Sequence, residues 1–175
     1  MDLTKAFLPD SVKVNDDFFR IHTGHSYWFR FAQLITQEEA YLTEFDFLYV
    51  DEKPSDRQEG FLSLYDFYYE KKELPRVEGY SGDKVIDYEI DSDLIYSAFY
   101  ECYNIDLYET QLHWHKARAL LSGLNNTKLN NIMGWRCSTD TKNKEIMRLK
   151  RTWGLPEKLT KAEQKEFDEF EVQFK

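Results

Sequence analysis

The chain has 175 residues, 42% of them hydrophobic and 17% aromatic, and it carries a formal net charge of −9. A chain of this length buries roughly 70% of its unfolded surface, so a single domain needs no disulfide for stability. Cys102 and Cys137 lie far apart in the sequence and show no C-x-x-C spacing, a pattern that fits a reducing compartment. The first residues lack a signal-peptide pattern, and nowhere do about 18 apolar residues follow one another. These features exclude a membrane-spanning helix and favour a soluble cytoplasmic protein.

The charge is distributed unevenly along the chain. Residues 1–93 carry 10 Lys and Arg against 21 Asp and Glu, a net charge of −11, so residues 94–175 carry 13 against 11, a net charge of +2. The most basic window, residues 127–153, has 7 basic and 2 acidic residues. Such a bipolar chain can attract copies of itself or a basic partner, although most charge runs are only solvated surface.

Residues 11–23 predict a β-hairpin. Apolar residues alternate on both arms, and Asn15-Asp16 between them tolerates the positive φ of a tight turn. Two strands alone are marginal in water, so the hairpin must pack on helices or pair with a hairpin of another copy.

Helices are expected from residue 24 to residue 72. The first carries an apolar stripe from Trp28 to Ile35, and a Thr36-x-x-Glu39 capping box opens the second. A Ser55-x-x-Gln58 capping box opens the third, which ends at Lys71-Lys72. The expected buried residues of the second and third helices are Tyr41, Phe45, Leu48, Phe61, Leu64, Tyr65 and Tyr68.

Residues 74–91 combine Pro, Gly and many charges, which predicts a loop with at most one short strand. Residues 92–124 then predict a helical hairpin whose facing apolar stripes form the centre of the fold. Asp91, Ser92 or Asp93 can cap its first helix, and Gly123 lies where the second should stop.

Three further helical segments are expected after residue 124. Apolar spacing predicts short helices around Leu129 to Met133 and around Ile146 to Trp153, and Gly154-Leu155-Pro156 ends the second of these. A Thr160-x-x-Glu163 capping box opens a last helix. Its apolar stripe is formed by Phe167, Phe170 and Phe174.

The predicted fold class is therefore mainly α, within the α+β class. An N-terminal β-hairpin is followed by a bundle of about six to seven helices around the helical hairpin at 92–124. Residues 1–153 form a single helical domain in this prediction, with a subdivision at the loop 74–91 left open, and residues 154–175 form a C-terminal helical extension.

No arrangement of residues predicts catalysis. His113 and His115 would point about 200° apart on a helix and could not chelate one ion. The glycines form no nucleotide-binding loop, and no Ser lies in G-x-S-x-G. Arg136 with the nearby Lys142, Lys144 and Lys150 could bind phosphates, but a pI near 5.0 disfavours nucleic acid. We therefore expect no catalytic residue, no cofactor and no metal, and a protein that is not an enzyme.

Three spaced blocks of the central stretch, Asp91 to Phe99, Tyr103 to Leu107 and Leu112 to Leu124, resemble in order the signature of the bacteriophage Gp-fifteen family. That family occurs in tailed phages and prophages of low-GC Gram-positive bacteria, and its pattern continues with a later I-x-x-x-R. The residues that carry the resemblance are Asp93, Ile95, Tyr96, Phe99, Tyr103, Ile105, Asp106, Leu107, His113, Trp114, Leu121 and Leu124. The chain departs from the family at Asp16 and Asn104, where glycine is usual, and at His115 and Ala117, where tryptophan and phenylalanine are usual.

The resemblance implies a tail assembly chaperone. Genes of this kind lie between those of the major tail protein and the tape-measure protein. In that role, copies of the chain in the cytoplasm of the bacterial host would coat the long tape-measure protein and leave as tail-tube subunits polymerise around it. The expected partners are the tape-measure protein, with the major tail protein or an upstream tail chaperone as further candidates, and other copies of the chain.

The aromatic content exceeds what one small core requires, which suggests a partner-binding surface. The residues expected to form it are Trp28, Phe31, Tyr65, Tyr68 and Tyr69, with Phe167, Phe170 and Phe174 as a second patch. Two alternatives are a phage regulator that binds nucleic acid through residues 127–153, and a structural component of the virion tail.

Overall fold

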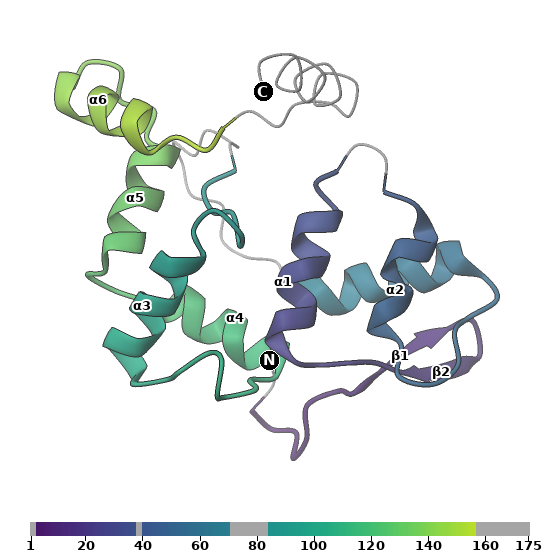
Figure 1. Cartoon of the computed structure of the whole chain (residues 1–175). Coiled ribbons are helices and arrows are strands. Elements are labelled where there is room, and N and C mark those ends of the chain that lie inside the picture. Colours follow the sequence, from purple (N-terminus) through teal and green to yellow (C-terminus); the bar gives the residue numbers. More distant parts are fainter. Residues whose placement is uncertain (1–2, 38–39, 71–83, 157–175) are drawn as a thin grey trace, which may run out of the picture.

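The computed structural model describes residues 3–37, 40–70 and 84–156. Within these ranges the fold is mainly helical, with a two-stranded antiparallel hairpin at its N-terminal end (Figure 1), which confirms the predicted fold class. The elements are β1 (Ser11–Val14), β2 (Asp17–Arg20), α1 (His25–Leu34), the 3₁₀ helix η1 (Leu42–Leu48), α2 (Arg57–Tyr69), α3 (Ser92–Tyr103), α4 (Trp114–Gly123), α5 (Lys128–Cys137) and α6 (Lys144–Trp153).

The hairpin turns at Asn15, whose φ is 55°, as the sequence predicts. Val12 pairs with Phe19 and Val14 with Asp17 across the two strands. The hairpin packs on a helix of the same chain: β1 contacts α2, and the Ser63 hydroxyl donates a hydrogen bond of 2.6 Å to the Lys13 carbonyl. Of the two arrangements left open by the sequence, packing on helices is therefore the one found.

Two helix starts differ from the prediction. Instead of an α-helix opened by Thr36, the described residues contain the 3₁₀ helix η1, and the Tyr41 N–H donates to the Glu44 carboxylate over 3.0 Å at its start. The third helix starts one residue late, because the Asp56 carboxylate accepts from the Glu59 N–H at 3.0 Å. At both starts an acidic side chain accepts a hydrogen bond from a backbone N–H three residues away, which Glu44 reaches toward the N-terminus and Asp56 toward the C-terminus.

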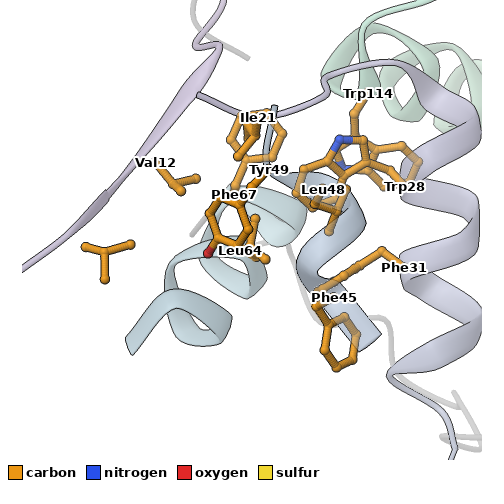
Figure 2. Close-up of a cluster of buried hydrophobic side chains, with 11 residues drawn as sticks. Val12, Ile21, Trp28, Phe31, Phe45, Leu48, Tyr49, Leu64, Phe67 and Trp114 are labelled. Carbon is orange, nitrogen blue, oxygen red and sulfur yellow. The ribbon is translucent and has the colours of Figure 1, made fainter. Parts of the chain in front are cut away.

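Two clusters of buried apolar side chains form the core. The first joins the hairpin, α1, η1 and α2 (Figure 2), and Trp28 is central to it because its ring lies 4.6 Å from Phe67 and 6.3 Å from Trp114 of α4. The second cluster joins α3, α5 and the end of α4. Its buried members are Ile95, Ala98, Phe99, Leu124 and Leu129.

The predicted helical pair at 92–124 is present, and α4 ends at Gly123 as expected. The pair bridges the two clusters instead of enclosing one centre, because Trp114 belongs to the first and the apolar face of α3 to the second. Tyr103 links the two helices by donating from its hydroxyl to the Leu120 carbonyl over 2.8 Å. Residues 84–91 of the preceding segment contain turns and no strand, while residues 71–83 lie outside the described ranges.

Candidate partner-binding surfaces

Trp28 and Phe31 do not belong to a surface. Both side chains have 0% exposure, and the Trp28 indole N–H donates to the His22 carbonyl over 2.8 Å. The prediction that they contact a partner is wrong because α1 turns this stripe toward η1 and α2, where it forms the centre of the first cluster (Figure 2). Apolar spacing identified the stripe but not the side it faces.

Helix α2 has two faces of different character. Leu64 and Phe67 are buried in the first cluster, whereas Leu62, Tyr65 and Tyr69 are 50%, 41% and 42% exposed. These three residues are spaced i, i+3 and i+7, so they form one stripe along the helix, which we call the α2 stripe. The exposure of Tyr65 and Tyr69 agrees with their predicted place in a binding surface, whereas the expectation that Tyr65 is buried is wrong. The sequence did not single out Leu62.

Contacts with the core hold the tyrosines of α2 in place. Tyr68 is half-buried, with its ring 4.9 Å from Trp114 and 4.7 Å from Tyr69, and the Tyr65 ring lies 4.6 Å from Tyr69. Burial, together with a hydrogen bond to Tyr65, raises the pKa of Tyr69 to about 12. The stripe is therefore an uncharged aromatic surface whose rings are already packed against one another.

A second aromatic surface lies on α3. The Tyr96 ring is 6.2 Å from Tyr100 and 5.8 Å from Tyr108, and Tyr100 and Tyr108 are 52% and 90% exposed. The Tyr96 hydroxyl donates to the Asp106 carboxylate over 2.9 Å, a bond that raises the pKa of Tyr96, and Glu109 adds to that rise. In the sequence, Tyr96 and Asp106 stand out only as residues that carry the family resemblance. The i, i+4 spacing of Tyr96 and Tyr100 on one helix was the signal that could have revealed this surface.

A cavity of about 200 Å³ opens beside these tyrosines, between α1 and α3. Apolar and aromatic side chains dominate its lining, which we call the α3 pocket. The lining residues that matter below are Phe29, Tyr88, Ile95, Tyr96, Leu107 and Tyr108.

Arg136 is not available to bind phosphates, so the phosphate-binding role considered for it in the basic segment 127–153 is wrong. It is 5% exposed and forms a bidentate ion pair with Asp91, with N–O distances of 2.6 and 2.9 Å. Its remaining contacts are donations to the carbonyls of Trp153 at 2.6 Å and Val85 at 3.0 Å. Asp91 occupies the N-cap position of α3, as one of the three predicted candidates, but its side chain makes no capping hydrogen bond. Its carboxylate pairs with this arginine and also accepts from the Asp87 N–H.

The geometry predicted for His113 and His115 is also corrected. Their rings lie 5.0 Å apart because His113 is the N-cap of α4 and not part of the helix, and its Nδ1 accepts from the His115 N–H. The Nε2 atoms of His113 and His115 lie 2.9 Å from the carbonyls of Pro9 and Phe67, respectively. Burial lowers the pKa of both, with Glu70 opposing the shift at His115. Among the described residues, no group of three His, Cys, Asp or Glu side chains is placed to hold a metal ion.

Some predicted residues are not tested. Phe167, Phe170 and Phe174 lie outside the described residues. None of the helices in the described ranges has the length and apolar character that a membrane span requires.

Comparison with known proteins gives one match. A family model described as Bacteriophage Gp15 protein matches residues 8–175, which is nearly the whole chain. No curated protein and no solved structure matches. The matched range includes the three spaced blocks between Asp91 and Leu124, and also Arg136, which pairs with Asp91. The chain therefore belongs to the bacteriophage Gp15 protein family.

Proposed function

We propose that the chain is a phage tail assembly chaperone that acts without catalysis in the host cytoplasm and holds apolar segments of the tape-measure protein. The observation that carries the proposal is the α2 stripe, an exposed and preorganised aromatic surface on a member of a bacteriophage family.

The stripe suits an amphipathic helix as its ligand. Leu62 to Tyr69 span about 10 Å, or two helical turns, so the stripe can contact apolar side chains spaced i, i+3 and i+7 on a partner helix. The rings of Tyr65 and Tyr69 already lie 4.6 Å apart, so binding orders few additional rotamers. Their hydroxyl groups also keep the surface compatible with water when no partner is bound.

A chaperone must also release its client. A stripe of three side chains gives weak binding at one site, and an array of copies along one tape-measure chain gains avidity from their number. Tail-tube subunits that compete for the same segments can then displace the copies one at a time. The excess of acidic residues before position 94 would keep such an array soluble.

Co-expression with the cognate tape-measure protein tests this function. We expect the tape-measure protein to become soluble and to copurify with the chain. Changing Tyr65 and Tyr69 together to Ser should abolish both effects without unfolding the chain, whereas Phe18→Ser, at a 72% exposed residue of β2, should leave both unchanged. If the wild-type chain neither binds the tape-measure protein nor improves its solubility, the proposal is wrong.

Mass spectrometry of purified virions distinguishes a chaperone from a structural tail component. A chaperone leaves before the tail is complete, so its peptides should be absent from mature particles. Peptides of this chain at a fixed ratio to the major tail protein would show that it stays in the tail, and would contradict the proposal.

A further inference from the structure

The α3 pocket lies in the most one-sidedly charged part of the described chain. Residues 88–115 contain 6 Asp and Glu and no Lys or Arg. Within the described residues only one of these six, Asp91, has a cationic partner, and that pair is buried. Asp106 and Glu109 act electrostatically on Tyr96 in the pocket wall, and Asp93 lies one turn before Tyr96 on α3. An apolar opening is therefore flanked by acidic side chains whose charge is not neutralised within the described fold.

Helix α6 has the opposite character. Its half-buried side faces α5, where Lys150 donates to the Ser138 carbonyl and the carbonyl of Trp153 accepts from Arg136. The outward side carries Lys144, Arg148 and Arg151 at i, i+4 and i+7, and Met147, at i+3, lies at the edge between this side and the half-buried one. The three basic residues are exposed, and Met147 is half-buried.

We propose that α6 of one copy docks in the α3 pocket of a second copy, with Met147 entering the cavity. An unbranched methionine can adapt to an irregular apolar site of about 200 Å³. Lys144 and Arg151 then meet the acidic rim formed by Asp93 and Glu109, and the exposed faces of Tyr100 and Tyr108 add cation–π attraction. The partner is a second copy because the chain itself carries both complementary surfaces.

The contact joins two different surfaces, so it is heterologous and generates a ring or an open row of copies and not a two-fold dimer. α6 lies beyond α5, away from the pocket between α1 and α3 (Figure 1), so the two surfaces belong to different parts of the described fold. This inference takes one point from the proposed function, namely the expectation that copies of the chain assemble. Tape-measure binding is measured separately through α2, so either idea can fail alone.

Sedimentation velocity of the purified full chain tests the contact. We expect concentration-dependent association beyond a dimer that weakens as salt rises, because the Debye length falls from about 10 Å at 0.1 M to about 3 Å at 1 M. The pair of changes Lys144→Glu and Arg151→Glu, and separately the pair Asp93→Lys and Glu109→Lys, should each raise the dissociation constant about tenfold or more. A matched control with Lys13→Glu and Arg20→Glu, which changes the net charge equally in the β-hairpin, should associate like the wild type.

Mixing the two defective variants tests whether α6 of one copy contacts the α3 pocket of another copy. In the mixture, each altered α6 meets an altered pocket of opposite charge, and each unaltered α6 meets an unaltered pocket, so association should return. The two variants have formal charges of −13 and −5, because the substitutions change the wild-type charge of −9 by −4 and by +4. Both are negative, so attraction between oppositely charged chains cannot explain the recovered association. A wild-type chain that stays monomeric, association that stops at a dimer, or a mixture that does not recover would each overturn the proposal.

Discussion

At the scale of single residues, the ion pair between Asp91 and Arg136 connects chain positions 45 residues apart. Asp91 is 2% exposed and Arg136 is 5% exposed, so the attraction acts with little solvent screening, but both charges also lose their hydration. The carbonyls of Val85 and Trp153 and the Asp87 N–H provide further hydrogen bonds that offset this loss. The arginine thereby fixes the turn before α3 and the end of α6 to α5.

Removing one member of this pair should destabilise the fold strongly. We expect Arg136→Met to lower the free energy of unfolding by about 3–5 kcal/mol, because the Asp91 carboxylate would stay buried without its partner. Urea denaturation measures the change. The control is Arg148→Met, because its pair with Glu145 is exposed to solvent and should contribute little to stability. Equal effects of the two substitutions would contradict the assigned role of the buried pair.

At the scale of elements, histidines fasten the loop 104–113 to its surroundings. The His25 N–H donates to the Leu112 carbonyl at 2.8 Å, and the Leu112 N–H donates back to Nδ1 of His25 at 3.3 Å. His113 makes the same kind of contact with its Nδ1, which accepts from the His115 N–H. An Nδ1 atom that accepts a hydrogen bond carries no proton, so the fold selects the neutral imidazole at both positions.

This arrangement predicts a loss of stability in mild acid. Burial lowers the pKa of His25 and His113 below the ordinary 6.5. The stabilisation that comes from neutral imidazoles is therefore complete above pH 6.5 and is lost as the pH falls through the lowered values, because the unfolded chain binds protons first. Between pH 6.5 and the lowered pKa of each group, the free energy of unfolding should fall by up to about 1.4 kcal/mol per pH unit, and it should level off below that pKa.

Urea denaturation across this pH range measures the effect. His25→Gln should flatten the profile, because glutamine does not titrate. His22→Gln is the control, since the His22 ring stacks on Tyr27 and its side chain makes no hydrogen bond among the described contacts. A profile that His25→Gln leaves unchanged would show that the imidazole of His25 is not held neutral.

At the scale of the whole molecule, a small set of side chains in the described ranges connects the two core clusters. Phe29 and Tyr88 pack against both, and their rings stack at 4.6 Å. The Phe29 ring also meets Trp114 edge-on at 6.0 Å. These contacts couple the half that carries the α2 stripe to the half that carries the α3 pocket.

Truncating Phe29 should uncouple the two halves. In the wild type we expect the most protected amides of α2 and α3 to exchange with the same free energy of opening, because the clusters unfold together. Because Phe29 is half-buried, in Phe29→Ala that free energy should fall by roughly 1–3 kcal/mol in one half and by less in the other. Hydrogen exchange read by mass spectrometry reports each helix separately. An equal loss in both helices would indicate one cooperative unit that does not depend on this ring.

Local sequence signals were sufficient for much of the fold. Asn15 marked the hairpin turn, Gly123 marked the end of α4, and the apolar spacing located α1, α3, α5 and α6. The three spaced blocks within 91–124 also indicated the family, which the match over residues 8–175 shows. These features depend on residues close together in the chain, so the sequence by itself determined them.

Only the tertiary structure decided which apolar stripes face solvent. Trp28 and Tyr65 lie on similar helical patterns, yet the first is fully buried and the second is 41% exposed, because exposure depends on which distant elements pack against each helix. The pairing of Asp91 with Arg136 and the aromatic pocket beside Tyr96 depend on the same long-range contacts. The sequence thus determined the elements and the family, and tertiary packing determined the surfaces that remain free to bind a partner.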